Sequence, residues 1–211
     1  MGILKTIFNN TAEPRGFWGR LMARGMNSGH ARQAIWGIGL MDIPAGARIL
    51  DVGCGGGGNI ARLLERDASC HVTGLDHSSV SVAESRALNA NAVESGSCDV
   101  VQGGVQDLAS LFPPASFDVV TVFETIYFWP DVQGCFRRVH DVLAPGGSLY
   151  VVNEEAVDTS SAHRWEGLID GMSVYEPEDI VRMLRDAGFE DVSRTDETRR
   201  NWLCVRARRL R

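Results

Sequence analysis

Lysine is almost missing from this chain: Lys5 is the single lysine among 211 residues, although lysine and arginine together number 21. The chain therefore contains no Tyr-x-x-x-Lys pair and no other obvious constellation for hydride transfer. This scarcity weakens the case for a nicotinamide-dependent oxidoreductase.

Long apolar runs are missing too, since no stretch reaches the roughly 18 residues that a membrane-spanning helix needs. The opening residues MGILKTIFNN are not followed by the apolar core and cleavage site of a signal peptide. The five cysteines are far apart and form no C-x-x-C pair, which is typical of reduced thiols rather than disulfides or a zinc site. We therefore expect a cytoplasmic protein with no membrane partner and no bound metal.

Positive charge is also scarce, and the formal net charge is −6. Surfaces that bind nucleic acids are basic. The one basic cluster lies near the C-terminal end, at Arg206, Arg208, Arg209 and Arg211. Such a tail is typical of a solvated terminus or of a last strand with one wet face. We expect no nucleic-acid partner.

Short β-rich runs alternate with helical patterns along most of the chain. The expected strands are RILDV, HVTGLD, DVVQGG, FDVVTVFE and GSLYVVNE, at 48–52, 71–76, 99–104, 117–124 and 147–154. Apolar residues at helical spacing over 132–143 predict a helix between the last two of these strands. Repeated strand–helix–strand units predict an α/β fold with a doubly wound parallel sheet, whose ligand crevice lies at the carboxyl ends of the strands. The length suits a single domain over 1–211.

The C-terminal part departs from this repetition. The stretch YEPEDIVRMLRDAGF predicts a helix with Pro177 in its first turn and Gly188 at its end. Two strands are expected after it, at 191–195 and 201–208. Because a tight turn cannot join parallel neighbours, the final strand should run antiparallel within the sheet.

The stretch ILDVGCGGGGNI fits two cofactors at once. Gly53, Gly55 and Gly58 form G-x-G-x-x-G, the dinucleotide fingerprint. Asp51, Gly53, Gly55 and Gly57 form D-x-G-x-G-x-G, a common start of folds that bind S-adenosylmethionine. Under either interpretation, Asp76 at the end of the second strand can accept hydrogen bonds from both ribose hydroxyls. These residues indicate the fold and leave the cofactor open.

Five motifs in sequence order favour one cofactor. They are ILDVGCGGGG, VTGLDHS, VQGGVQDL, SFDVVTVFETIYFWPD and VLAPGGSLYVVNE. Over roughly residues 45–154 the chain resembles the class I S-adenosylmethionine-dependent methyltransferases, specifically the type 11 small-molecule group. The resemblance implies a seven-stranded, mostly parallel sheet with an antiparallel last strand. It also implies S-adenosylmethionine as cofactor and a small organic molecule as methyl acceptor.

The resemblance also implies roles for individual residues. The methionine end of the cofactor would lie against Asp51, Gly53, Gly55 and Gly57. The ribose would bind Asp76, and His77 would pack near the adenine.

On the adenine side the chain departs from the family pattern. The family usually has an acid directly after the first glycine of VQGGVQDL, where this chain has Gly104. We therefore expect the adenine to bind the backbone amide of Val105 and the side chain of Gln106, with Asp107 as a further candidate. Glu124 would line the methionine end or face the acceptor.

The acceptor side is the least defined part of the site. The stretch FETIYFWPD lacks the Asn/Asp-Pro-Pro-aromatic signature typical of amine methylation on nucleobases or glutamine, which weakens a nucleic-acid substrate further. The catalytic residue stays unknown, with His30, Tyr127 and His163 as candidates. Methyl transfer mainly needs alignment and the exclusion of water, so a missing catalytic pair is no objection.

An apolar helical segment within 1–44 is expected to cover the crevice, and the protein is expected to be a monomer or homodimer.

Two alternative functions stay open. One is a protein that binds S-adenosylmethionine without transferring its methyl group. The other is a NAD-dependent oxidoreductase.

Overall fold

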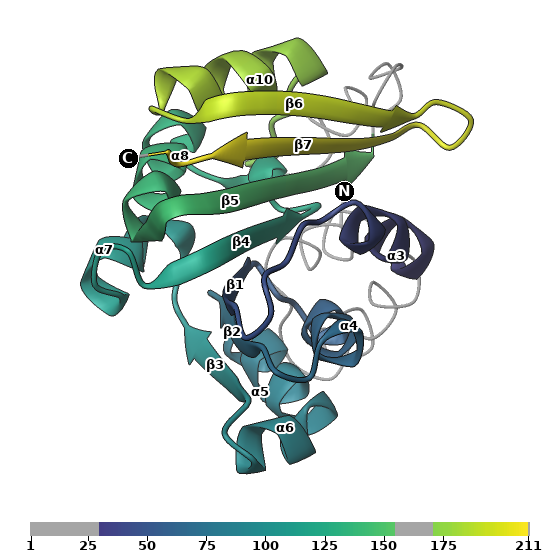
Figure 1. Ribbon diagram of the computed structural model, residues 1–211, viewed down its shortest axis with the longest axis vertical. Helices are drawn as coiled ribbons and strands as arrows, with labels where there is room; N and C mark the ends of the chain where they lie inside the picture. Colours follow the sequence, from purple (N-terminus) through teal and green to yellow (C-terminus); the bar gives the residue numbers. More distant parts are fainter. Residues whose placement is uncertain (1–29, 155–170, 211) are drawn as a thin grey trace, which may run out of the picture.

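A seven-stranded sheet forms the centre of the computed structural model, which describes residues 30–154 and 171–210 (Figure 1). The strand order is β3-β2-β1-β4-β5-β7-β6. The first five strands pair in parallel, whereas β7 runs antiparallel to both β5 and β6. The predicted fold class and the antiparallel last strand are confirmed.

The bounds of the elements follow the sequence patterns closely. The strands are β1 Arg48–Val52, β2 His71–Asp76, β3 Cys98–Gln102, β4 Phe117–Phe123, β5 Leu143–Glu154, β6 Glu190–Glu197 and β7 Trp202–Arg208. The helices are α3 Ala31–Gly39, α4 Gly58–Arg66, α5 Ser79–Leu88, α6 Ala90–Glu94, α7 Leu108–Leu111, α8 Val132–Val142 and α10 Pro177–Asp186. Two short 3-10 turns, η1 Val105–Asp107 and η2 Ile126–Phe128, follow β3 and β4.

Both faces of the sheet are covered by helices, because alternate residues of a strand point to opposite faces. In β1, Leu50 belongs to the core beneath α8 and α10, where it lies with Phe136 and Ile180. Its neighbour Ile49 belongs to the core beneath α3, α4 and α5, where Ile60 also lies. The near-continuous apolar strands are thus the expected consequence of a sheet buried on both sides.

One helix boundary differs from the prediction. The periodicity over 132–143 includes Leu143, but α8 ends at Val142 and Leu143 is extended, with φ −72° and ψ 140°. Leu143 instead pairs with Phe117 of β4, and a register irregularity follows before the regular pairing from Val119 onward. The strand therefore begins four residues earlier than the 147–154 stretch suggests.

Within residues 30–154 and 171–210, no helix is both long and apolar enough to cross a membrane. The same residues contain no group of three potential metal ligands. All five cysteines are buried and unpaired.

Candidate cofactor and acceptor site

The carboxyl ends of β1, β2, β3 and β4 and the first turn of α3 surround a cavity of about 380 Å³. It lies where the strand order reverses, since β1 is flanked by β2 on one side and β4 on the other. Ligands of open α/β sheets bind at such a switch point. The predicted crevice is therefore present.

The glycine loop after β1 forms one wall of this cavity. The backbone amides of Gly53 and Cys54 both donate to the carbonyl of Leu75, at 2.7 and 3.0 Å, which ties the loop to β2. Gly53 has φ +75°, and a Cβ there would overlap the side chain of Thr125. Gly55 has φ +52°, and a Cβ there would meet no atom within 4 Å, so it would project into open space. The bare backbone at Gly55 thus leaves room for a ligand.

Asp76 lies at the end of β2 and lines the cavity. Its Oδ2 accepts a hydrogen bond from the amide of Gly55, and its Oδ1 accepts one from the amide of Ser78, both at 2.9 Å. These bonds fix the carboxylate and still leave acceptor positions for a ligand, because a carboxylate offers about four. Burial raises the pKa of Asp76, although the two amide bonds oppose that shift.

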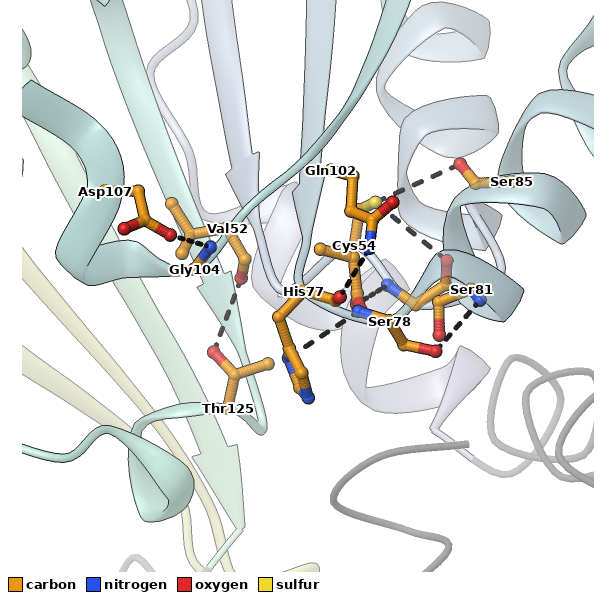
Figure 2. Close-up of polar contacts among 12 residues, drawn as sticks. Val52, Cys54, His77, Ser78, Ser81, Ser85, Gln102, Gly104, Asp107 and Thr125 are labelled. Carbon is orange, nitrogen blue, oxygen red and sulfur yellow. Dashed lines mark hydrogen bonds and ion pairs between the residues drawn. The ribbon is translucent and has the colours of Figure 1, made fainter. Parts of the chain in front are cut away.

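Next to Asp76, the loops after β2 and β3 form the far end of the cavity. His77 lines it, with Nδ1 3.9 Å from Asp76 Oδ1. The amide of Gly104 donates to Asp107 Oδ2 at 2.9 Å (Figure 2). A Cβ at Gly104 would overlap the carboxamide of Gln106, so Gln106 takes the space that a side chain at position 104 would need. Val105 and Gln106 also line the cavity, as the adenine prediction requires.

Two residues predicted to hold the methionine end lie behind the cavity wall. Asp51 is 1% exposed, and its Oδ1 accepts a hydrogen bond from the hydroxyl of Thr121 at 2.8 Å. Burial raises the pKa of Asp51 to about 7. Gly57 directly precedes α4 and packs on α5, where a Cβ would come within 2.9 Å of the Cα of Ser85. Neither residue lines the cavity in the described part of the chain.

Glu124 forms the opposite end, just past β4. Its backbone has φ +55°, a conformation that is strained for a residue with a side chain. Oε1 of Glu124 accepts hydrogen bonds from Nε2 of Gln33 and from the amide of Glu154, both at 2.5 Å. The side chain of Tyr127 is also hydrogen-bonded to Glu124. Burial is the main cause that raises the pKa of Glu124 to about 8, and the nearby charge of Glu154 adds to it.

The aromatic residues after β4 divide between cavity and core. Phe128 and Trp129 line the cavity, and Trp129 packs edge-on against Phe136 with ring centroids 5.4 Å apart. Tyr127, a predicted catalytic candidate, does not line the cavity, but its side chain is hydrogen-bonded to Glu124, which does. The η2 turn therefore presents Phe128, rather than Tyr127, to a ligand.

The comparisons with known proteins agree with this geometry. Residues 50–151 match the family described as "Methyltransferase domain". The chain is 34% identical over 165 residues to the Cycloartenol-C-24-methyltransferase of Arabidopsis thaliana, covering 74% of this chain and 48% of that protein. The domain over residues 50–151 is a class I S-adenosylmethionine-dependent methyltransferase domain.

Two solved structures share the fold of this methyltransferase. The Haloferax volcanii putative methyltransferase, solved in complex with the Trm112 methyltransferase activator, has a TM-score of 0.78 at 20% identity, over 90% of this chain and 94% of that one. The Haemonchus contortus phosphoethanolamine N-methyltransferase 2, in complex with S-adenosylmethionine, has a TM-score of 0.69 at 18% identity, over 99% of this chain and 56% of that one. The chain spans about half the length of the sterol methyltransferases that it matches.

The cavity suits the family cofactor, S-adenosylmethionine. Its volume lies within the range typical of small-molecule sites. Gly55 leaves an open cradle, and Asp76 retains acceptor positions close to it. The chemistry of the lining thus agrees with a nucleoside at the Asp76 end and a methionine moiety along the glycine loop.

Of the two histidine candidates, the structure describes His30 but not His163. His30 precedes α3 and lines the cavity, with its Nδ1 3.9 Å from Glu154 Oε1. His163 lies outside the described residues. Both remain predictions as catalytic groups.

Sequence reasoning missed Gln33 and Thr125. Gln33 is 1% exposed and lies on the buried face of α3 with Ala34, Gly37 and Ile38. A lone glutamine on an otherwise apolar helix face is a signal that the sequence did contain. Thr125 is harder to find, because its role depends on the close approach of its side chain to Gly53 across two loops.

Proposed function

We propose that this methyltransferase domain transfers a methyl group from S-adenosylmethionine to a small organic acceptor by in-line displacement. When bound, S-adenosylmethionine supplies a methyl group on a positively charged sulfur, which the lone pair of an acceptor can displace. The observation that carries the proposal is that Asp76, the open backbone of Gly55 and Glu124 all line the same cavity.

The chain's own residues have distinct tasks in this proposal. Asp76 would accept the ribose hydroxyls, and the backbone amide of Val105 and the side chain of Gln106 would contact the adenine. Asp51 and Gly57 would support the methionine end from behind the wall, through the loop that they hold in place. Phe128 and Trp129 would exclude water from the acceptor during the displacement.

Several broader expectations accompany this proposal. The protein would work in the cytoplasm as a monomer or homodimer, as a single domain, and without a nucleic-acid partner. The N-terminal segment 1–44, of which residues 1–29 lie outside the described part of the chain, would cover the crevice. The place of His30, Gln33 and Ala34 in the cavity wall supports this for the described part of the segment.

Calorimetric titration with S-adenosylhomocysteine tests the cofactor, with NAD as the comparison ligand. We expect saturable binding of S-adenosylhomocysteine and none of NAD; the reverse result contradicts the proposal. Release of S-adenosylhomocysteine is then measured with thiols, phenols, carboxylates and amines as acceptors. Binding without turnover across all four classes favours the alternative of a protein that holds S-adenosylmethionine without transferring its methyl group.

A further inference from the structure

The strand order separates the two ends of the cavity. Asp76 ends β2, the glycine loop follows β1, Glu124 follows β4 and Glu154 ends β5, so these groups lie in series across the sheet. Neighbouring strands are about 4.8 Å apart, which places the Glu124 end roughly 10 Å from the Asp76 end. A nucleoside held at Asp76 therefore leaves the Glu124 end to the reacting groups.

Two hydrogen-bond acceptors meet at the Glu124 end. One is the carboxyl group of Glu124 itself, held by Gln33 and by the amide of Glu154. The other is Oε1 of Gln33, which is buried and accepts no hydrogen bond from any described residue. Gln33 lines the cavity, and its Nε2 is already used by Glu124, so its free polar atom is an acceptor. An unpaired buried acceptor is unfavourable until a donor reaches it.

The described residues that line this end carry no permanent positive charge. Of the residues that line the described cavity, none is a lysine or arginine, whereas Asp76 and Glu124 are acids. Glu154 adds a further carboxylate beside Glu124, and its Oε1 lies 3.9 Å from Nδ1 of His30. A phosphate or carboxylate on the acceptor would find no permanent positive partner among these groups, whereas a cation or a neutral donor would be favoured.

We propose that the acceptor carries a primary or secondary amine, which binds between the carboxyl group of Glu124 and Oε1 of Gln33. A neutral primary amine has two N–H donors, and a protonated primary or secondary amine has at least two, so either can serve both acceptors, whereas a hydroxyl has one donor. A protonated amine gives up one proton before methyl transfer, because only the neutral nitrogen has the lone pair that displaces the sulfur. The aromatic rings of Phe128 and Trp129 in the same wall suit an apolar or aromatic body attached to that amine. This inference rests on the proposed methyl transfer and narrows its substrate class.

The test compares three probes of matched shape: 2-phenylethylamine, 2-phenylethanol and phenylacetate. Each is titrated into protein saturated with S-adenosylhomocysteine, and dissociation constants are obtained from NMR shifts. We expect the amine to bind at least about 10-fold more tightly than either other probe, the size of one charge-assisted hydrogen bond. In Glu124→Gln and in Gln33→Leu this preference should fall to about threefold or less. Glu178→Gln and Gln133→Leu, which change the same residue types outside the cavity, should retain it.

Several results would overturn the inference. These are equal affinity for amine and alcohol, tighter binding of the carboxylate, no saturable binding of the amine, or a preference that survives in both cavity variants. Affinity for S-adenosylhomocysteine alone, measured on every variant together with its melting temperature, separates this inference from the proposed function. If the wild type fails to bind S-adenosylhomocysteine, the proposed function fails first. If the cavity variants lose that affinity while the amine preference persists, Gln33 and Glu124 serve the cofactor and only the amine inference is wrong.

Discussion

Nε2 of Gln33 donates a hydrogen bond to Oε1 of Glu124 at 2.5 Å, although the two residues are 91 positions apart. The bond ties α3 to the turn after β4, where the backbone of Glu124 is held at φ +55°. The same carboxyl oxygen receives the amide of Glu154 at the end of β5. The side chain of Glu124 thus joins α3, the turn after β4 and the end of β5. A change in its protonation therefore alters hydrogen bonds to both Gln33 and Glu154.

The raised pKa of Glu124 predicts a pH-dependent stability. The folded protein holds a proton on Glu124 up to a pKa of about 8, whereas an unperturbed glutamate loses it near 4.5. Between these values the folded state binds more protons than the unfolded chain, so the free energy of unfolding falls as pH rises. Glu124→Gln removes this contribution, worth up to about 1.4 kcal/mol for each pH unit inside the window.

Urea denaturation at about pH 5.5 and about pH 7.5 measures this difference. We expect the wild type to lose more stability between the two values than Glu124→Gln does, with Glu178→Gln behaving as the wild type. Parallel slopes for all three proteins would show that Glu124 is ionised in the folded state at neutral pH.

Asp76→Asn should weaken the binding of S-adenosylhomocysteine by about 10- to 100-fold, because a charged acceptor of ribose hydroxyls is lost. The asparagine retains the shape of the side chain but keeps one oxygen, so the amide of Gly55 or Ser78 also loses its partner. Calorimetry on the folded variant measures the affinity. Asp118→Asn removes a carboxylate that pairs with Arg48 outside the cavity and should leave the affinity unchanged. An unaltered dissociation constant for Asp76→Asn would refute the ribose assignment.

The sequence predicts the fold well and the contacts of the site less well. The five parallel strands are apolar runs that end at glycines or acids, so their positions follow from local composition. Ser78 caps α5, as serine commonly does at the start of a helix, and its hydroxyl accepts from the amide of Ser81 at 3.3 Å (Figure 2). These features depend on neighbours in the chain.

The remaining features depend on three-dimensional register. Asp51 begins the D-x-G-x-G-x-G motif, but it lies within β1 in register with Thr121 of β4, and its side chain meets that residue inside the sheet. Tyr127 and Phe128 are adjacent, and only the path of the η2 turn decides which of them lines the cavity. The hydrogen bond between Gln33 and Glu124 depends on the packing of α3 against α4 and β5. No periodicity in the sequence encodes these three outcomes.

Gly55→Ala and Gly53→Ala should separate binding from folding. Both positions have positive φ, which costs an alanine about 1–2 kcal/mol. At Gly55 the new methyl group enters open space in the cavity wall, so we expect weaker binding of S-adenosylhomocysteine with a small loss of stability. At Gly53 it overlaps Thr125, so we expect the larger fall in melting temperature.

Gly96→Ala is the matched control for Gly55→Ala, because Gly96 has φ +76° with nothing within 4 Å and lies in the turn before β3. It should lower the melting temperature as Gly55→Ala does and leave the affinity intact. If Gly55→Ala binds S-adenosylhomocysteine as tightly as Gly96→Ala, the glycine loop does not contact the cofactor at that position.

Thr121→Val should destabilise the protein, and more so at high pH. Thr121 is fully buried, and its hydroxyl gives Asp51 the hydrogen bond that holds the pKa of that carboxyl down to about 7 against the effect of burial. Oδ2 of Asp51 has no partner among the described residues, so loss of this bond leaves the ionised carboxylate almost unsupported. We expect a loss of about 1–3 kcal/mol in the free energy of unfolding above pH 7 and a smaller loss near pH 5.5, where Asp51 is protonated. Thr195→Val, at an exposed position of β6, should change neither value. An equal loss at both pH values would mean that Thr121 acts through packing alone, and that Asp51 does not depend on it to ionise behind the glycine loop.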